Sequence, residues 1–171
     1  TQRALTVSAT ASNKVYDGGT TATVTLSDNR VAGDVLGASN TTANFVDKNV
    51  GTGKTVNVGG ISISGTDAGN YTVNTTAAAT ANITQRALTV SAAGSNKVYD
   101  GGFGATVHPS PDTVDGLVPG ESLNVIPTGV FEDKNAGTGK TVDVTFAVSN
   151  GAGGGLVSNY ALPPLTTTTT A

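Results

Sequence analysis

The chain has 171 residues, a net charge of −3, only 12% charged residues, and no Cys, Met or Trp. This composition excludes disulfides and thiolate metal sites, and it lacks the basic stripe of a nucleic-acid-binding protein and the polybasic segment of a membrane-binding one. No apolar run approaches the ~20 residues of a membrane-spanning helix. Thr (29 residues) and Gly (23 residues) favour strands and turns, so we expect an all-β protein with no nucleic-acid partner and no membrane insertion.

The expected strands of the first half alternate apolar and polar residues with a period of two. In chain order they cover 5–10, 22–26, 43–46, 55–58, 61–64, 71–73 and 79–83. Gly59-Gly60, between two of these strands, predicts a hairpin. About seven short strands in one unit favour a small β-sandwich of Ig-like type, or a small barrel. A β-grasp-like unit is the alternative if one segment forms a helix, although Asp67–Asn70 is short for one.

The same sequence then returns, so the chain reads as two tandem modules, 1–83 and 84–171. The shift between matching motifs grows from 83 to 86 and then to 89 residues, as follows: 1–9 returns at 84–92, 13–19 at 96–102, 47–49 at 133–135, 51–56 at 137–142, and 70–71 at 159–160. The second copy therefore carries two insertions of three residues, within 108–127 and 151–155, and both are expected in loops.

The joint between the modules contains no flexible linker. One expected strand ends at Ile83 and the next begins at Arg86, whereas a flexible tether needs several Gly, Ser or Pro residues. We therefore expect a stiff joint and modules arranged end to end, with the neighbouring repeat as the partner of each. Copy two reaches Ala171 without the Asn-Ile that closes copy one, so its last strand is expected to be incomplete, and an open edge of this kind can recruit a strand from a neighbour.

Aromatic residues recur at three positions, as the pairs Tyr16 and Tyr99, Phe45 and Phe131, and Tyr71 and Tyr160. They stand within apolar alternation. The prediction is that all of them are the largest pieces of a small core and do not form a stacking platform for carbohydrate.

The sequence predicts no catalytic, cofactor-binding or metal-binding residues. His108, the sole His, has no counterpart in copy one, so a Ser-His-Asp arrangement is not a property of the module. Gly53-Lys54-Thr55 resembles the end of a phosphate-binding loop, but Lys48 stands where that loop needs Gly, so a turn entering a strand is expected. Asp47 beside Lys48 is a poor calcium site, because calcium takes six to eight oxygen ligands.

Two modifications stay open. Four Asn-x-Thr triplets are glycosylation sequons, at Asn40, Asn70, Asn74 and Asn82. A Lys–Asn isopeptide bond would need a buried lysine beside a carboxylate, and Lys14 and Lys97 are the candidates.

The motifs at 13–18 (Asn-Lys-Val-Tyr-Asp-Gly), 47–54 (Asp-Lys-Asn-Val-Gly-Thr-Gly-Lys) and 67–71 (Asp-Ala-Gly-Asn-Tyr) together resemble the YDG-type repeat. With the related MBG repeats, it is found in large secreted bacterial adhesins similar to filamentous haemagglutinin. The resemblance covers both copies and implies no catalytic residue. It implies a structural stalk or spacer, extracellular at a Gram-negative cell surface, that projects a distal adhesive region, with host or matrix glycans or proteins bound by other regions. A glycan- or matrix-binding module and a self-association repeat for biofilm are the alternatives.

Overall fold

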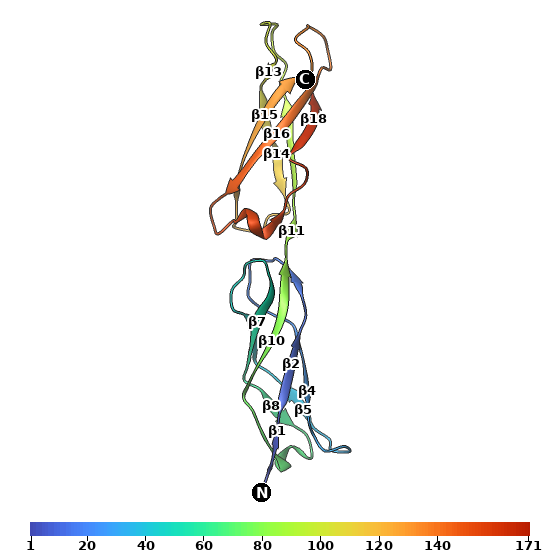
Figure 1. Cartoon of the computed structure of the whole chain (residues 1–171), viewed down its shortest axis with the longest axis vertical. Helices are drawn as coiled ribbons and strands as arrows, with labels where there is room; N and C mark the ends of the chain where they lie inside the picture. Colours follow the sequence, from blue (N-terminus) through green and yellow to red (C-terminus); the bar gives the residue numbers. More distant parts are fainter. The chain divides into compact units, whose positions relative to one another are not determined.

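The computed structural model describes the backbone of residues 1–171 and the side chains of 1–108 and 114–171. The chain forms two compact units, Thr1–Thr84 and Gln85–Ala171, here called repeat 1 and repeat 2. Both units are all-β and sandwich-like (Figure 1). The described backbone has no α-helix, only the short 3-10 turns Ala68–Asn70 and Val157–Asn159, so the β-grasp-like alternative is not supported. Among the described residues, no helix is long and apolar enough to cross a membrane.

Repeat 1 is built around a four-stranded sheet in which β7 and β10 lie side by side (Figure 1). Its strands, in spatial order, are β3 (Lys14–Val15), β10 (Thr76–Thr84), β7 (Gly51–Gly59) and β6 (Thr42–Phe45). β10 is antiparallel to β7 but parallel to β3, with Ile83 opposite Lys14. Val56 and Val58 of β7 alternate with exposed neighbours and are fully buried, which is the period-two pattern of a half-buried strand.

The remaining strands of repeat 1 pair two by two. They are β1 (Arg3–Leu5), β2 (Val7–Ala11), β4 (Val24–Asp28), β5 (Gly37–Ser39), β8 (Ser62–Ser64) and β9 (Tyr71–Val73). β2 pairs with β4 and β5 with β8, both antiparallel, whereas β1 and β9 are parallel. β2 also lies against β10, so the buried side chains of the two layers meet between them.

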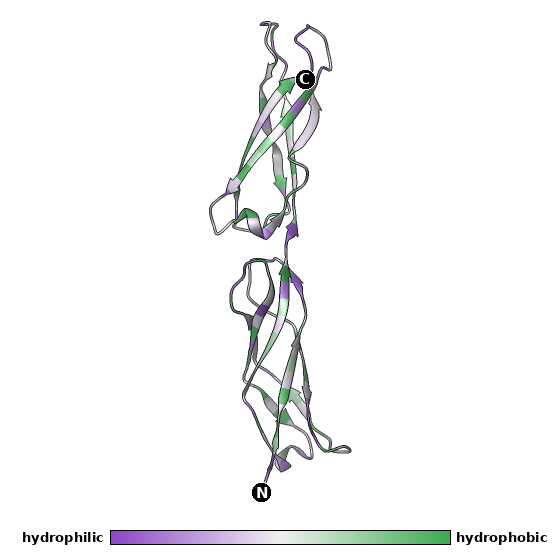
Figure 2. Cartoon of the chain, in the orientation of Figure 1, coloured by the Kyte–Doolittle hydropathy of each residue, from purple (hydrophilic) through white to green (hydrophobic). Residues whose placement is uncertain are grey.

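Repeat 2 follows a similar plan, except that its sheet has no counterpart of β3 beside its last strand and has β13 at the opposite edge. Its four-stranded sheet runs in the order β13 (Gly104–Ala105), β15 (Leu123–Phe131), β16 (Thr141–Asn150) and β18 (Thr166–Thr170). It is accompanied by the pairs β12 (Thr89–Gly94) with β14 (Val107–Asp115) and β11 (Arg86–Ala87) with β17 (Tyr160–Ala161). Figure 2 shows hydrophobic residues alternating with more polar ones along β15 and β16. The buried members form a core cluster of Phe131, Val142, Val144 and Phe146.

The predicted hairpin at Gly59-Gly60 is wrong. The strands on either side of these glycines do not pair with each other: β7 pairs with β6, and β8 pairs with β5. Gly59 lies opposite Thr42 and Ser62 opposite Ser39, so the register is continuous across the interruption. The two glycines therefore kink one long antiparallel pair. They allow the kink because Gly60 has a φ of 64°, in the left-handed region that favours glycine.

The two insertions of repeat 2 differ in their place. The later one lies in a loop after β16, as expected, where Gly151 N donates to Gly155 O. The earlier one lies within β14, not in a loop: Ala93 is opposite His108 but Val90 is opposite Val114, so three more residues are taken up on one strand than on the other. The side chains of 109–113, in this stretch, lie outside the described residues.

Candidate functional site

The joint between the repeats is short, because Gln85 alone separates β10 from β11. On its N-terminal side the chain is held by repeat 1. The side chain of Ile83 is 1% exposed, and the Thr84 carbonyl accepts a hydrogen bond of 2.9 Å from Tyr16 N. The chain therefore stays part of the repeat 1 sheet up to Thr84.

On its C-terminal side the chain is held by repeat 2. Gln85 Nε2 donates to Ser158 O at 3.2 Å, and Arg86 Nε donates to Gly116 O. The start of repeat 1 makes the equivalent bonds, from Gln2 Nε2 to Gly69 O and from Arg3 to Asn29 O. The recurring Gln-Arg is thus an anchor, which fixes the first residues of each repeat to loops of that repeat.

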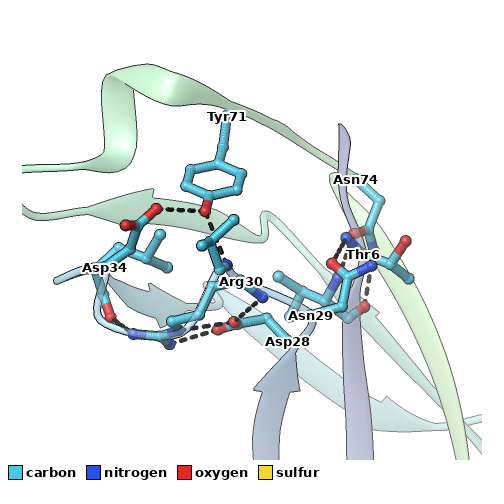
Figure 3. A network of polar contacts seen from close by, with 10 residues as sticks. Thr6, Asp28, Asn29, Arg30, Asp34, Tyr71 and Asn74 are labelled. Carbon is cyan, nitrogen blue, oxygen red and sulfur yellow. Dashed lines mark hydrogen bonds and ion pairs between the residues drawn. The ribbon is translucent and has the colours of Figure 1, made fainter. Parts of the chain in front are cut away.

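A second recurring anchor is centred on a tyrosine. In repeat 1, Tyr71 Oη donates to Asp34 and accepts a bond of 2.9 Å from Val31 N (Figure 3). Val31 and Asp34 are the ends of a turn, since Asp34 N donates to Val31 O, and Gly33 within it has a φ of 99°. The hydrogen bond with Asp34 raises the pKa of the Tyr71 phenol, because it favours the protonated hydroxyl.

Repeat 2 builds the same anchor with glutamate. Tyr160 Oη donates to Glu121 at 2.8 Å and accepts from Val118 N at 3.2 Å, and Glu121 N closes the turn onto Val118 O. Gly120 has a φ of 86° there. This pair of carboxylates was not predicted from the sequence. The sequence nevertheless contains a matching pattern for the two turns, Val-Ala-Gly-Asp at 31–34 and Val-Pro-Gly-Glu at 118–121.

Beside the tyrosine anchor of repeat 1 lies an ion pair that repeat 2 lacks. Arg30 contacts both carboxylate oxygens of Asp28, with Nε 2.8 Å from Oδ1, and also donates to Leu36 O (Figure 3). The hydrogen bond from Arg30 lowers the pKa of Asp28. Asp115 and Leu117 stand at the equivalent places in repeat 2, where the guanidinium is therefore missing.

Lys14 and Lys97, the isopeptide candidates, make matching ion pairs. Lys14 Nζ lies 2.7 Å from Asp17 Oδ1 and also donates to Gly19 O, and Lys97 makes the same contacts with Asp100 and Gly102. Each ammonium also lies 5.6 Å from the centroid of a buried phenylalanine ring. These acceptors are carboxylate and carbonyl oxygens, not asparagine amides, so the isopeptide bond gains no support from them.

Asp47, which its sequence context makes a poor calcium ligand, forms an ion pair with a lysine. Lys54 Nζ lies 2.6 Å from Asp47 Oδ1, and the pair recurs as Lys140 with Asp133. Hydrogen bonding to Lys54 lowers the pKa of Asp47, and the same holds for Asp133 beside Lys140. Among the side chains that the structure describes, no three acidic or imidazole groups gather as metal ligands would. Gly53-Lys54-Thr55 lies within β7.

Three of the four sequon asparagines make side-chain hydrogen bonds. Asn40 Nδ2 donates to Thr42 O at 3.2 Å. Asn74 Nδ2, the atom that would carry a glycan, donates to Val7 O and Thr76 O. Asn82 Oδ1 accepts from Gly53 N at 2.8 Å. Glycosylation at Asn74 would therefore compete with the contact that fixes the start of β2.

Five of the six recurring aromatic residues are buried, as predicted: Tyr16, Phe45, Tyr71, Phe131 and Tyr160. The prediction is wrong for Tyr99, which is 59% exposed, although its counterpart Tyr16 is 0% exposed. The reason lies in the last strand of each repeat. Ala171 pairs with Lys140 as Ala81 pairs with Lys54, and the 171 residues contain no counterpart of Asn82–Thr84 in repeat 2.

Repeat 2 has a cavity of about 300 Å³ at this place. Its lining includes Asn96, Lys97, Tyr99, Phe131, Lys140 and Ala171. The cavity lies where the last residues of β10 lie in repeat 1, between the Lys97 segment and the residues that lead into β16.

The fold and these contacts define a class of protein: a tandem of small β-sandwich-like repeats held by recurring side-chain anchors. A comparison with protein families matches the chain twice to the YDG domain, at residues 1–80 and 84–170. The chain belongs to the YDG domain family. Searches among curated proteins and among solved structures found no match.

Proposed function

We propose that the two repeats are a structural spacer, part of the stalk of a bacterial surface or secreted adhesin, which holds a distal adhesive region away from the cell. The observation that carries the proposal is the anchoring of the joint. The Thr84 carbonyl is hydrogen-bonded to repeat 1 and the Gln85 side chain to repeat 2. Both residues at the joint are therefore held by their own repeat. A joint of this kind restricts bending, because few backbone dihedrals remain to be varied.

The recurring residues support the same proposal. What the two copies share is a set of anchors for turns and strand ends, namely Gln85 with Arg86 and the tyrosine–carboxylate pairs, together with core side chains. The proposal assigns the repeats no catalytic role. The glycan-binding alternative is weakened because Tyr16, Phe45 and Tyr71, which would form its stacking platform, are buried.

The proposed location and partners rest on the resemblance of the sequence to repeats of large secreted adhesins. An extracellular position at the cell surface suits a chain without cysteine. The neighbouring repeat is then the main partner of each repeat, and ligand binding belongs to other parts of the parent protein.

The stiffness of the joint is testable by distance measurements, since the chain has no native cysteine to interfere with labelling. Spin labels at Ser27→Cys and Ser149→Cys, both on exposed positions, would report one distance between the repeats. We expect a narrow distance distribution in double electron–electron resonance. A matched variant with Gly-Gly-Ser inserted between Thr84 and Gln85 should broaden it. Equal breadth in the two proteins would contradict the proposal.

A further inference from the structure

The four Asn-x-Thr sequons all lie in repeat 1, at Asn40, Asn70, Asn74 and Asn82, and the structure describes the side chains of all four. A transferase that joins a sugar to asparagine must reach the Nδ2 atom and must also hold the two residues that follow it. In a folded domain, a usable sequon therefore needs an accessible amide and a segment with no side chain in the core. These two conditions separate the four sequons.

Two of the sequons contain a buried residue at their middle position. In 70–72 this residue is Tyr71, which is 5% exposed and whose hydroxyl is bonded to Asp34. In 82–84 it is Ile83, which is 1% exposed and lies within β10. A transferase could hold either segment only after the buried side chain had left the core, which the stability of the repeat opposes.

The third sequon, 74–76, has an acceptor amide that is already in use. Asn74 Nδ2 donates to Val7 O at 3.0 Å and to Thr76 O at 2.7 Å, and Asn74 Oδ1 accepts from Val7 N. Both hydrogens of this amide are therefore bonded. A sugar on Nδ2 would replace one of them and would break a bond that holds β2 or the start of β10.

The fourth sequon, 40–42, meets both conditions. Thr41 and Thr42 are exposed and Asn40 is partly exposed, so no side chain of this segment belongs to the core. Among the described residues, Asn40 Nδ2 donates only to Thr42 O, at 3.2 Å and on the exposed surface. One hydrogen of the amide is thus left for substitution, and the other can keep its bond.

The kink of repeat 1 is what presents this segment. Regular pairing ends at Ser39, opposite Ser62, and resumes at Thr42, opposite Gly59, so 40–41 lie outside the strand ladder. The corresponding strands of repeat 2, β15 and β16, pair without interruption, and repeat 2 contains no sequon. The kink and the accessible sequon therefore occur together, in one repeat only.

We propose that Asn40 is a glycosylation site, which takes a sugar activated by a diphosphate leaving group from a sequon-specific N-glycosyltransferase. This inference goes beyond the spacer function. In the reaction, Asn40 Nδ2 forms a bond to the anomeric carbon of the sugar, and the bond from that carbon to the diphosphate oxygen breaks. Its electron pair leaves with the diphosphate, and one amide proton passes to a base of the transferase.

The test offers the folded chain two activated sugars, because the diphosphate can belong to a nucleotide or to a lipid. One sample contains UDP-glucose with a soluble N-glycosyltransferase, and the other contains a lipid diphosphate oligosaccharide with a membrane-bound oligosaccharyltransferase. Each enzyme is chosen for its ability to modify a synthetic peptide of residues 37–45. We expect mass spectrometry to find one glycan on the folded chain, at Asn40, from at least one donor, and the donor that reacts identifies the source.

Two variants control this measurement. Asn40→Gln should abolish the modification, whereas Asn70→Gln, which removes another sequon asparagine of repeat 1, should leave it unchanged. Asn40→Gln should also leave the unfolding temperature of repeat 1 unchanged, because the side-chain bond that it alters lies on the exposed surface. The loss of modification would then come from the acceptor atom and not from a loss of fold.

Two results would overturn the proposal. A folded chain that neither enzyme modifies, although both modify the peptide, would show that the kink does not present the segment. Modification at Asn70, Asn74 or Asn82 to the same extent as at Asn40 would show that burial and hydrogen bonding do not select the site.

Discussion

The long antiparallel strand pair is continuous in repeat 2 but kinked in repeat 1, where β5 with β8 and β6 with β7 form its two parts. In repeat 2 the pair consists of two uninterrupted strands, β15 and β16, and the buried Val144 and Phe146 are two residues apart. In repeat 1 the corresponding Val58 and Ile61 are three residues apart. Side chains alternate between the faces of a strand, so an odd spacing would turn Ile61 away from the core. The kink at Gly60 restores its direction.

The facing strand of repeat 1 is also one residue longer. Leu36 and Phe45 are nine residues apart, whereas Leu123 and Phe131 are eight apart, and all four side chains are buried. The extra residues in the two strands lie next to each other, because a Cβ on Gly60 would lie 2.0 Å from Thr41 Oγ1. A strand therefore tolerates an extra residue where its partner strand also has one, since the register on both sides is then unchanged.

The largest effect is expected from the two tyrosines that follow the Asn-Lys-Val motif. Tyr16→Ala should destabilise repeat 1 by about 3–5 kcal/mol, because it removes a fully buried aromatic side chain. Tyr99→Ala should change repeat 2 by less than about 0.5 kcal/mol, as for other exposed positions. Urea titrations followed by amide NMR signals of each repeat would measure both. Equal losses in the two repeats would contradict the difference in burial.

A smaller but still large effect is expected at the kink of repeat 1. Gly60→Ala should cost about 2 kcal/mol or more, because the new methyl group meets Thr41 and the backbone has a positive φ. Gly53→Ala is the matched control, since Gly53 has a φ of 59° but no atom near its added Cβ. The difference between the two denaturation midpoints isolates the contact with Thr41. Identical costs would show that the residues at the kink can move apart.

Removal of the tyrosine hydroxyls should have a moderate effect in both repeats. Tyr71→Phe and Tyr160→Phe each leave a backbone amide and a carboxylate without the hydroxyl partner, at a cost of about 1–2 kcal/mol. We expect the larger loss for Tyr160, whose bond to Val118 N is buried, whereas that of Tyr71 to Val31 N is only partly buried. Thermal unfolding of the two single variants and the double variant would test this order. Loss of stability in one repeat should leave the stability of the other repeat unchanged.

The smallest effect is expected for the stability of repeat 1 at low pH. The folded pKa of Asp28 lies below its ordinary value, so the charged carboxylate stabilises repeat 1 above about pH 4, and this stabilisation is lost as the pH falls through the folded pKa. Repeat 2 lacks the arginine, so the acid sensitivity of repeat 1 should be greater. Asp28→Asn should remove the difference. Denaturation midpoints of the two repeats between pH 6 and pH 3 would check it, and a difference that persists in the variant would assign it to another group.

Much of the fold could be predicted from the sequence, because the period-two alternation and the recurrence of the aromatic residues are local signals. The hairpin at Gly59-Gly60 was wrong because two glycines permit either a reversal or a kink, and only the position of the facing strand decides between them. The prediction for Tyr99 failed because burial of its counterpart Tyr16 involves the strand end at Asn82–Thr84, whose counterpart is not among the 171 residues.

The tyrosine anchors were missed for a different reason. Each joins a turn to a strand 37 or more residues further along the chain, and neither carboxylate stands in a motif shared letter by letter, since one is Asp34 and the other Glu121. A comparison of the two copies by chemical type would have revealed them.

The parallel pairing of β3 with β10 bears on how a repeat responds to mechanical force. A pull on the chain that leaves repeat 1 at Thr84 acts along β10, and therefore across the bonds that join Thr84 O to Tyr16 N and Asn82 N to Asn13 Oδ1. Bonds loaded in this shearing direction share the tension and must break together, whereas bonds at a peeled edge break one after another. The point at which tension passes from one repeat to the next is thus also a point at which the repeat resists extension.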